Sequence, residues 1–128
     1  MSRGLGDTTL FIAREVNRPL DSEALPDEIG VSVITIGELR AGVLSAADVE
    51  TRDRRLATLT QALALQPIPV DDQVADTWAK LRLLLRESDQ RMPVNDSWIA
   101  ATAMSLGVPV VTQDEDYVEL PGLTVITV

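Results

Sequence analysis

Short apolar segments alternate with longer amphipathic segments along this chain. Residues 29–34, 108–112 and 123–128 are rich in Val, Ile and Thr, so each is predicted to form a strand. A poorer strand is expected over 3–8, and a short edge strand over 67–70. The intervening segments have helical spacing and are predicted to form helices over 10–16, 35–46, 48–65, 73–88 and 95–106. Because strands separated by helices pair in parallel, the alternation predicts an α/β sandwich with a parallel sheet flanked by helices.

Residue types that cap helix N-termini stand at the start of four of these helices. The candidates are Asp7 or Thr8, Thr35 with Glu38 as a capping box, Asp71 or Asp72, and Asn95 or Asp96. A capping side chain accepts a hydrogen bond from a backbone N–H and needs no other role. Each of these acids therefore has a structural interpretation beside any catalytic one.

The absence of two residue types limits the chemistry. The chain has no His and no Cys, which excludes disulfides and thiolate metal sites and removes the commonest general base and zinc ligand. Any catalysis must then use carboxylates, hydroxyls, Arg, the single Lys80 or a hard metal ion. The absence of Cys also fits a cytoplasmic protein, which we expect this to be.

The formal net charge of −9 argues against nucleic acid as a partner, because affinity for nucleic acid comes mostly from Lys and Arg on phosphates. A carboxylate cluster that binds a divalent cation would weaken that argument. The positive charge is also concentrated, in the segments 52–55 and 82–91. The alternative is that the acidic balance serves solubility alone.

Length and hydropathy predict one domain spanning residues 1–128 with no membrane association. The hydrophobic fraction of 45% supports a core, and no run of 18 or more apolar residues is present. The first seven residues lack the apolar stretch of a signal peptide.

Four acids are placed where a parallel sheet would gather them. Asp7 follows the first strand, Glu38 lies one turn past the second, Asp114 follows the strand over 108–112, and Asp96 stands at a helix start. The carboxyl ends of parallel strands meet at one edge, where functional crevices lie. Oxygen ligands suit Mg²⁺ or Mn²⁺, and clustered carboxylates repel each other unless a cation is present. The pattern indicates a Mg²⁺ or Mn²⁺ site, with helix capping as the alternative.

Four blocks of the sequence resemble, in order, the motif blocks of the PIN-domain family. They are Asp7–Ile12, Ser32–Gly42, Asn95–Ala103 and Val111–Tyr117. Within that family the chain resembles VapC-type toxins of type II toxin–antitoxin systems, and the resemblance covers about residues 5–128.

The resemblance implies a PIN-like three-layer sandwich and a Mg²⁺- or Mn²⁺-dependent endoribonuclease acting on RNA such as tRNA or rRNA. It also implies a cognate VapB-type antitoxin and a homodimer. By position, Asp7, Glu38, Asp96 and Asp114 match the family's acidic quartet. Asp7 and Asp96 would be the principal metal ligands. Glu38 and Asp114 would bind the metal directly or through water and orient the attacking water.

Neighbouring polar residues have implied supporting roles. Thr112, Thr8 and Asn95 would hydrogen-bond the acids, and Asp116 competes with Asp114 for the fourth acid position. One departure from the family is the Gly4–Gly6 segment, which stands where members carry an apolar strand. It predicts a short first strand before Asp7.

Further expectations concern the partners. Candidates for phosphate contacts are Arg40, Arg52, Arg54, Arg55, Arg82, Arg86 and Arg91. Leu39, Val43 and Leu44 are candidates for a groove that receives an antitoxin helix. Two other functions compete with the nuclease: a non-catalytic protein-binding module with the same fold, and a receiver-like Mg²⁺-binding signalling domain. The receiver would need a Lys after a late strand, whereas Lys80 falls in a predicted helix.

Overall fold

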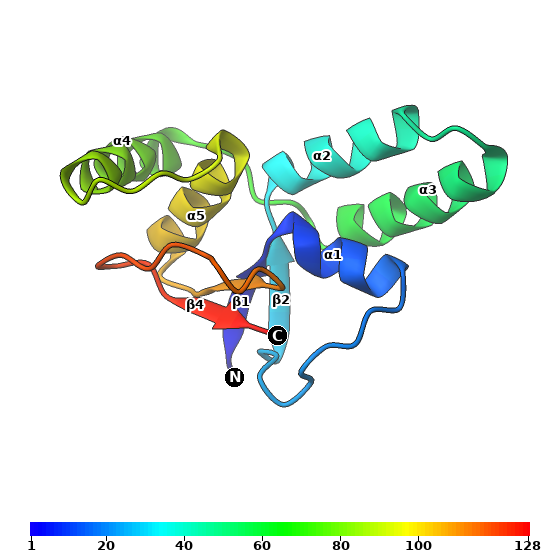
Figure 1. Cartoon of the computed structure of the whole chain (residues 1–128), viewed down its shortest axis with the longest axis horizontal. Helices are drawn as coiled ribbons and strands as arrows, with labels where there is room; N and C mark the ends of the chain where they lie inside the picture. The colour runs from blue at the N-terminus through cyan, green and yellow to red at the C-terminus, as the bar shows by residue number, and fades with distance from the viewer.

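The computed structural model describes residues 1–128 as four strands and five helices (Figure 1). In chain order they are β1 (Arg3–Gly6), α1 (Thr8–Glu15), β2 (Glu28–Val31), α2 (Val33–Leu44), α3 (Val49–Leu63), α4 (Asp72–Glu87), α5 (Val94–Leu106), β3 (Val110–Thr112) and β4 (Val125–Thr127). None of the helices is long and apolar enough to cross a membrane.

The four strands form one parallel sheet in the order β2-β1-β3-β4, which confirms the predicted α/β fold. Successive strand residues point to opposite faces of the sheet. Leu5 and Val110 therefore pack with α5 and α4 on one face, whereas Val111 packs with Leu10 of α1 on the other. The sheet is the middle layer of a three-layer sandwich, and the two faces have separate apolar clusters.

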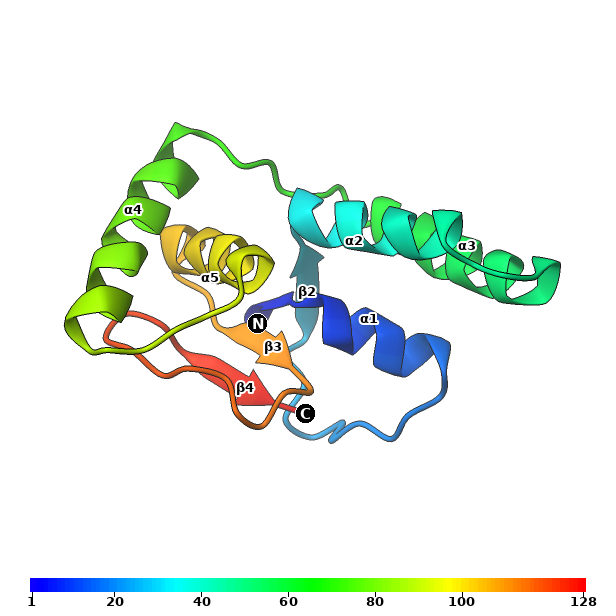
Figure 2. The ribbon, with the colours of Figure 1, turned by 45° about the horizontal axis from the view of Figure 1, so that its top comes forward.

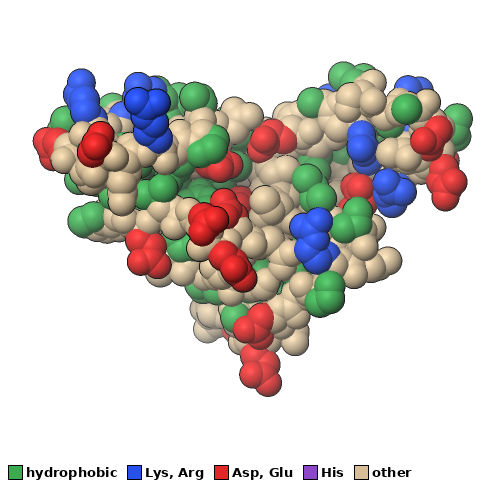
Figure 3. All heavy atoms as spheres, viewed as in Figure 1, with side chains coloured by type: hydrophobic (Ala, Val, Ile, Leu, Met, Phe, Trp, Pro, Cys, Tyr) green, Lys and Arg blue, Asp and Glu red, His purple; other side chains and the backbone are tan.

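Two helical pairs extend beyond the carboxyl edge of the sheet. The helices α2 and α3 pack side by side and project away from the sheet, while α4 packs on α5 at the opposite side (Figure 2). The space-filling view shows a notch between the two pairs, and acidic side chains gather in and below it (Figure 3). The edge of the sheet that the sequence indicated as functional lies below this notch.

The two glycines of β1, Gly4 and Gly6, are closely packed against neighbouring side chains. A Cβ on Gly4 would lie 2.5 Å from Cγ2 of Val111, and a Cβ on Gly6 would lie 2.8 Å from Cδ2 of Leu10. Distances that short do not occur between real atoms, so any side chain would push β1 away from its neighbours. The glycines that weaken the strand by propensity therefore allow β1 to lie in the centre of the sheet.

The prediction for the start of α2 is wrong by two residues. The helix begins at Val33 and not at Thr35, because the side chain of Ser32 accepts a hydrogen bond from the Ile34 N–H at 3.0 Å and caps it. Thr35 is fully buried inside the helix, so it forms no capping box with Glu38. The predicted strand over 67–70 is reduced to one isolated bridge, between Ser32 and Ile68.

The prediction for the start of α5 is also wrong. Pro93 occupies the N-cap position and no side chain caps the helix, so Asn95 and Asp96 lie inside the first turn. Proline is favoured where a helix begins, since it has no N–H to leave unpaired. Leu106, the last residue of the helix, is 49% exposed. Gly107 ends the helix with φ of 68°, a left-handed conformation that glycine adopts readily.

Two capping predictions are confirmed, because the side chains of Asp7 and Asp71 accept backbone hydrogen bonds at the starts of α1 and α4. Asp48 caps α3 in the same way. Of these, only Asp7 is buried.

Candidate active site

Asp7 is fixed at the junction of β1 and α1 by both of its carboxylate oxygens. Its Oδ1 accepts hydrogen bonds from the Thr9 hydroxyl at 2.5 Å and from the Leu10 N–H at 3.3 Å. Its Oδ2 accepts a hydrogen bond from the Thr112 hydroxyl at 2.6 Å, which ties α1 to the end of β3. The side chain is 3% exposed, so it is both a helix cap and a buried, oriented acid.

Burial raises the pKa of the Asp7 carboxyl above its ordinary value of 3.8. The hydrogen bonds from Thr112 and Thr9 oppose this effect because they favour the charged form. Thr9 was not among the residues expected to support the acids. Its hydroxyl also lies 3.2 Å from that of Thr112 and accepts the Gln113 N–H at 3.0 Å. Its only signal in the sequence is its place next to Thr8.

Glu38 is held from two sides. The Thr8 hydroxyl donates to Oε1 at 2.5 Å, and the Asn95 side-chain amide donates to Oε2 at 3.4 Å. The Thr8 hydroxyl in turn lies 3.1 Å from the hydroxyl of buried Thr35. Both residues predicted to support the acids at this position, Thr8 and Asn95, therefore contact Glu38. They join α1 and α5 to α2 across the site.

Asp96 is half-buried on the first turn of α5 and its carboxylate accepts no hydrogen bond from the protein. Its pKa is raised from 3.8 to about 6, first by burial and then by the negative charges of Asp7, Glu38 and Asp114. Asp96 is thus the acid on which the charges of the other three converge. A carboxylate so crowded is destabilised in its ionised form unless positive charge is supplied.

The loop after β3 places Asp114 rather than Asp116 beside Asp96. Asp114 contributes to the raised pKa of Asp96, and Asp116 does not. The Asp114 N–H donates to the Thr112 hydroxyl at 3.0 Å, and the Asp114 carboxylate accepts the Asp116 N–H at 2.9 Å. The backbone of Asp116 therefore helps to hold Asp114, and both residues are exposed.

Tyr117 is a further polar group at this site that the sequence did not single out. Its hydroxyl donates to the backbone carbonyl of Asp96 at 3.4 Å. Burial, together with the charges of Asp96, Asp7 and Asp114, raises the pKa of the phenol well above its usual range. The phenol thus stays protonated and can donate to the first turn of α5.

The donor set of the four acids fits a hard divalent cation. All candidate ligands are carboxylate oxygens, and none of the four acids pairs with an Arg or Lys, since the ion pairs of the chain are Arg3–Glu28, Arg54–Glu15 and Lys80–Asp76. No three acidic side chains are close enough to form a ready-made metal site. Mg²⁺ usually takes one or two protein carboxylates and keeps several waters, so two of these acids would be enough to hold it.

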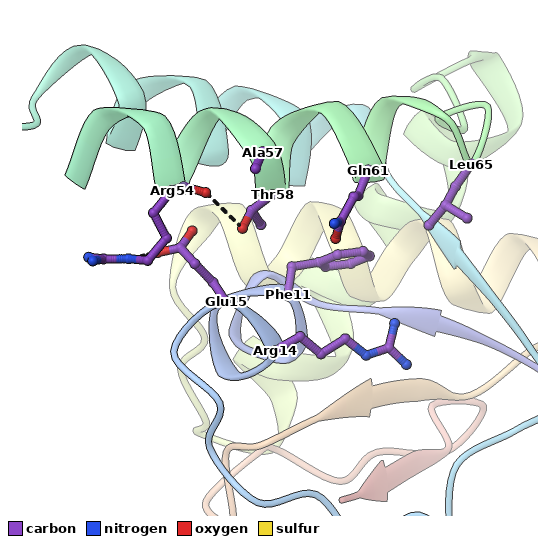
Figure 4. A pocket seen from close by; sticks show the side chains of 8 residues that line it. All are labelled: Phe11, Arg14, Glu15, Arg54, Ala57, Thr58, Gln61 and Leu65. Atoms are coloured by element: carbon purple, nitrogen blue, oxygen red, sulfur yellow. Dashed lines mark hydrogen bonds and ion pairs between the residues drawn. The ribbon is translucent and has the colours of Figure 1, made fainter. Parts of the chain in front are cut away.

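Two pockets lie near α1, and only one includes an acid of this site. The pocket between α1 and α3 is lined by Phe11, Arg14, Glu15, Arg54, Ala57, Thr58, Gln61 and Leu65 (Figure 4). None of these is one of the four acids, so this pocket does not belong to the site. A neighbouring groove between α1 and α2 includes Glu38 together with Ile12 and Leu39. It shares Glu15 and Arg54 with the first pocket.

The fold and the site define the class of protein. The family model for the PIN domain matches residues 6–123. The chain belongs to the PIN-domain family. Within that family it is similar to VapC ribonucleases, with 48% identity to ribonuclease VapC5 of Mycobacterium tuberculosis over 93% of this chain and 88% of that protein. Ribonuclease VapC4 of the same organism is 45% identical over 98% of this chain and 97% of its own length.

A solved structure shows the same arrangement. The chain superposes on one chain of the crystal structure of VapBC-5, a member of the VapBC family of toxin–antitoxin systems from M. tuberculosis, with a TM-score of 0.90 and 42% identity. The superposition covers 100% of both chains. This agreement confirms the PIN-like three-layer fold that the motif blocks implied.

Proposed function

We propose that this protein is a VapC-type toxin, an endoribonuclease that hydrolyses RNA phosphodiester bonds with the help of Mg²⁺, or of Mn²⁺ in its place. The observation that carries the proposal is the gathering of Asp7, Glu38 and Asp114, held by hydroxyl and amide groups, around Asp96, whose own carboxylate accepts no hydrogen bond. A chain with no His and no Cys has few other ways to activate water. Structured RNA such as tRNA or rRNA is the expected substrate.

The roles of the four acids follow from their surroundings. Asp7 and Asp96 would be the principal metal ligands, and Asp114 would bind the ion directly or through a water molecule. When bound, the ion supplies positive charge to the phosphate oxygens and lowers the pKa of a coordinated water. Glu38 keeps both oxygens oriented through Thr8 and Asn95, so it can accept a hydrogen bond from the attacking water and align it with the phosphorus.

The hydroxyl groups hold this arrangement rigid. Thr112 and Thr9 fix opposite oxygens of Asp7, so the buried acid cannot rotate when RNA binds. Tyr117 holds the first turn of α5 through the carbonyl of Asp96. The acids therefore stay in place without the free-energy cost of ordering them during the reaction.

We also propose that a VapB-type antitoxin covers the site and that the toxin acts as a homodimer in the cytoplasm. The proposal of an antitoxin partner is supported by the similarity to VapBC-5, which is a member of a family of toxin–antitoxin systems. The groove beside Glu38 is the expected seat. Leu39 lines this groove but is buried, Val43 packs against the helical core, and Leu44 is exposed without lining the groove. Ile12 also lines the groove and, at 40% exposed, offers the larger apolar contact.

The test is cleavage of defined RNAs by the purified protein. Labelled tRNA and rRNA fragments are incubated with the chain in Mg²⁺, in Mn²⁺ and in EDTA, and the product ends are sequenced. Hydrolysis at defined positions is expected with either ion and none in EDTA. Intact RNA under all three conditions would favour the non-catalytic protein-binding module. The receiver-like alternative is disfavoured because Lys80 lies within α4 and pairs with Asp76, at 2.9 Å.

A further inference from the structure

A strongly basic pocket lies between the end of α4 and the start of α5. Its volume is about 310 Å³, and its lining includes Arg82, Arg86, Arg91, Val94 and Ser97. These are three of the ten arginines of the chain, and all three are exposed. None of them forms an ion pair with an acid. Three unpaired guanidinium groups around one hollow in an acidic protein favour an anionic ligand.

One of these arginines is held in place by an aromatic stack. The guanidinium carbon of Arg82 lies 4.9 Å from the ring centroid of Trp78, and the ring of Trp78 stacks on that of Trp98 with centroids 4.1 Å apart and an interplanar angle of 1°. Such stacking favours the cation and reduces the number of side-chain conformations it samples. Arg82 is therefore partly ordered before any ligand binds.

The stack is tied to the helical turn that carries Asp96. The indole N–H of Trp78 donates to the Ser97 hydroxyl at 3.0 Å, and that hydroxyl donates to the carbonyl of Val94 at 2.5 Å. Val94 and Ser97 both line the basic pocket and flank Asp96 in the chain. The pocket and the candidate catalytic acid thus share one turn of α5 and have a fixed relationship.

The distribution of charge over the surface favours a role for this pocket in RNA binding. Acidic side chains lie in and below the notch, whereas basic side chains lie on the helical pairs on either side of it (Figure 3). With a net charge of −9, the protein repels RNA over most of its surface. Affinity for a polyanion then has to come from local clusters of Arg close to the cleavage site.

We propose that Arg82, Arg86 and Arg91 form a subsite for a backbone phosphate of the RNA, next to the phosphate that is cleaved. This inference rests on the proposed function. Planar guanidinium groups bind phosphate oxygens in pairs, and several around one hollow hold a phosphodiester in a fixed orientation. The three arginines are positioning residues: they bring the scissile phosphate over the acids and take no part in bond breaking.

The test measures RNA binding without cleavage. In an Asp96→Asn background, the triple variant R82Q/R86Q/R91Q is compared with a control, R3Q/R14Q/R18Q, that removes equal charge from other surfaces. Fluorescence anisotropy with a labelled RNA follows the affinity between about 50 and about 200 mM salt. We expect the triple variant to bind at least about tenfold more weakly, and the slope of its log–log salt dependence to fall by about 0.7–0.9, because one phosphate contact is lost. The control should bind within about threefold of the background protein.

Cleavage kinetics of the triple variant and of a double variant provide a second test of the subsite. In the background with Asp96 intact, the triple variant should raise KM and change kcat by less than about threefold, because the arginines position RNA and do no chemistry. The double variant R86Q/R91Q keeps the Arg82–Trp78 stack and should show the same effects in smaller degree. Circular dichroism confirms that each variant is folded.

The outcomes separate the subsite from the enzyme. If the parent protein cleaves RNA while the triple variant and the control bind it equally well, the subsite is wrong and the proposed function stands. If the triple variant binds RNA normally but loses affinity for the antitoxin, the pocket serves an acidic segment of that protein and the proposal is overturned. If the parent protein cleaves no RNA in any metal, it is the proposed function that fails.

Discussion

Replacing Asp96 by Asn should make the protein more stable at neutral pH in the absence of divalent metal. Asn has nearly the same shape but carries no charge, so the repulsion and desolvation that raise the pKa of Asp96 to about 6 would be removed. A carboxyl whose pKa rises on folding is protonated more readily in the folded state. Its ionisation therefore costs stability, and the cost grows as the pH rises from about 4 to about 6.

The size of the effect follows from the pKa. A rise from 3.8 to about 6 corresponds to about 3 kcal/mol, at about 1.4 kcal/mol for each unit of pKa. Because Asp96 is only half-buried, solvent screens part of this, and about 1–1.5 kcal/mol is the reasonable gain in the free energy of unfolding. For a chain of 128 residues that gain raises Tm by about 4–6 °C.

The assay is thermal unfolding in EDTA between pH 4 and pH 8, with D76N as the control. Asp76 is also an acid on a helix but is exposed and pairs with Lys80, so its replacement should leave Tm nearly unchanged. The advantage of D96N should be full above pH 6 and vanish near pH 4. Added Mg²⁺ should then raise the Tm of the parent protein more than that of D96N. A D96N protein less stable than the parent at pH 7 in EDTA would refute the reasoning.

Two further variants test other parts of the structure. Thr8→Val removes the hydroxyl that orients Glu38 and should lower kcat for RNA cleavage by about 10–100-fold, whereas Thr60→Val, which removes an exposed hydroxyl on α3, should leave kcat unchanged. Gly4→Ala should destabilise the fold by about 1–3 kcal/mol in urea titration because its Cβ has no room, whereas Gly37→Ala, with nothing within 4 Å of its Cβ, should stabilise α2 by about 0.5–1 kcal/mol. Equal stability of the two alanine variants would contradict the packing argument.

The fold could be predicted from the sequence because the spacing of apolar residues in each segment follows from which of its side chains are buried. The segments over 29–34 and 108–112 are apolar because both faces of a parallel sheet are covered, and both contain strands of the observed sheet. The first residue of each helix was harder to predict, because several neighbouring residues can act as the N-cap. Ser32, and not Thr35, occupies the N-cap position of α2, and Pro93 occupies that of α5 in place of Asn95 or Asp96. Sequence patterns do not show which of several neighbouring candidates will be the N-cap residue.

The site could be anticipated only as a set of acids near one sheet edge. Asp7 and Asp114 follow strands, and that placement can be read from the chain. The contact of Thr112 with Asp7 joins residues 105 apart, and it depends on β3 pairing beside β1, which no local pattern reveals. The error at α5 had a functional consequence: since Asp96 is not needed as a cap, its carboxylate remains free of backbone hydrogen bonds.

The most direct test of the central claim is RNA cleavage by the parent protein, D96N and D76N, side by side in Mg²⁺ and in EDTA. The proposed chemistry predicts cleavage by the parent and by D76N only when Mg²⁺ is present, and no cleavage by a folded D96N under either condition. Cleavage by D96N at the parental rate in Mg²⁺, or cleavage by the parent in EDTA, would contradict it.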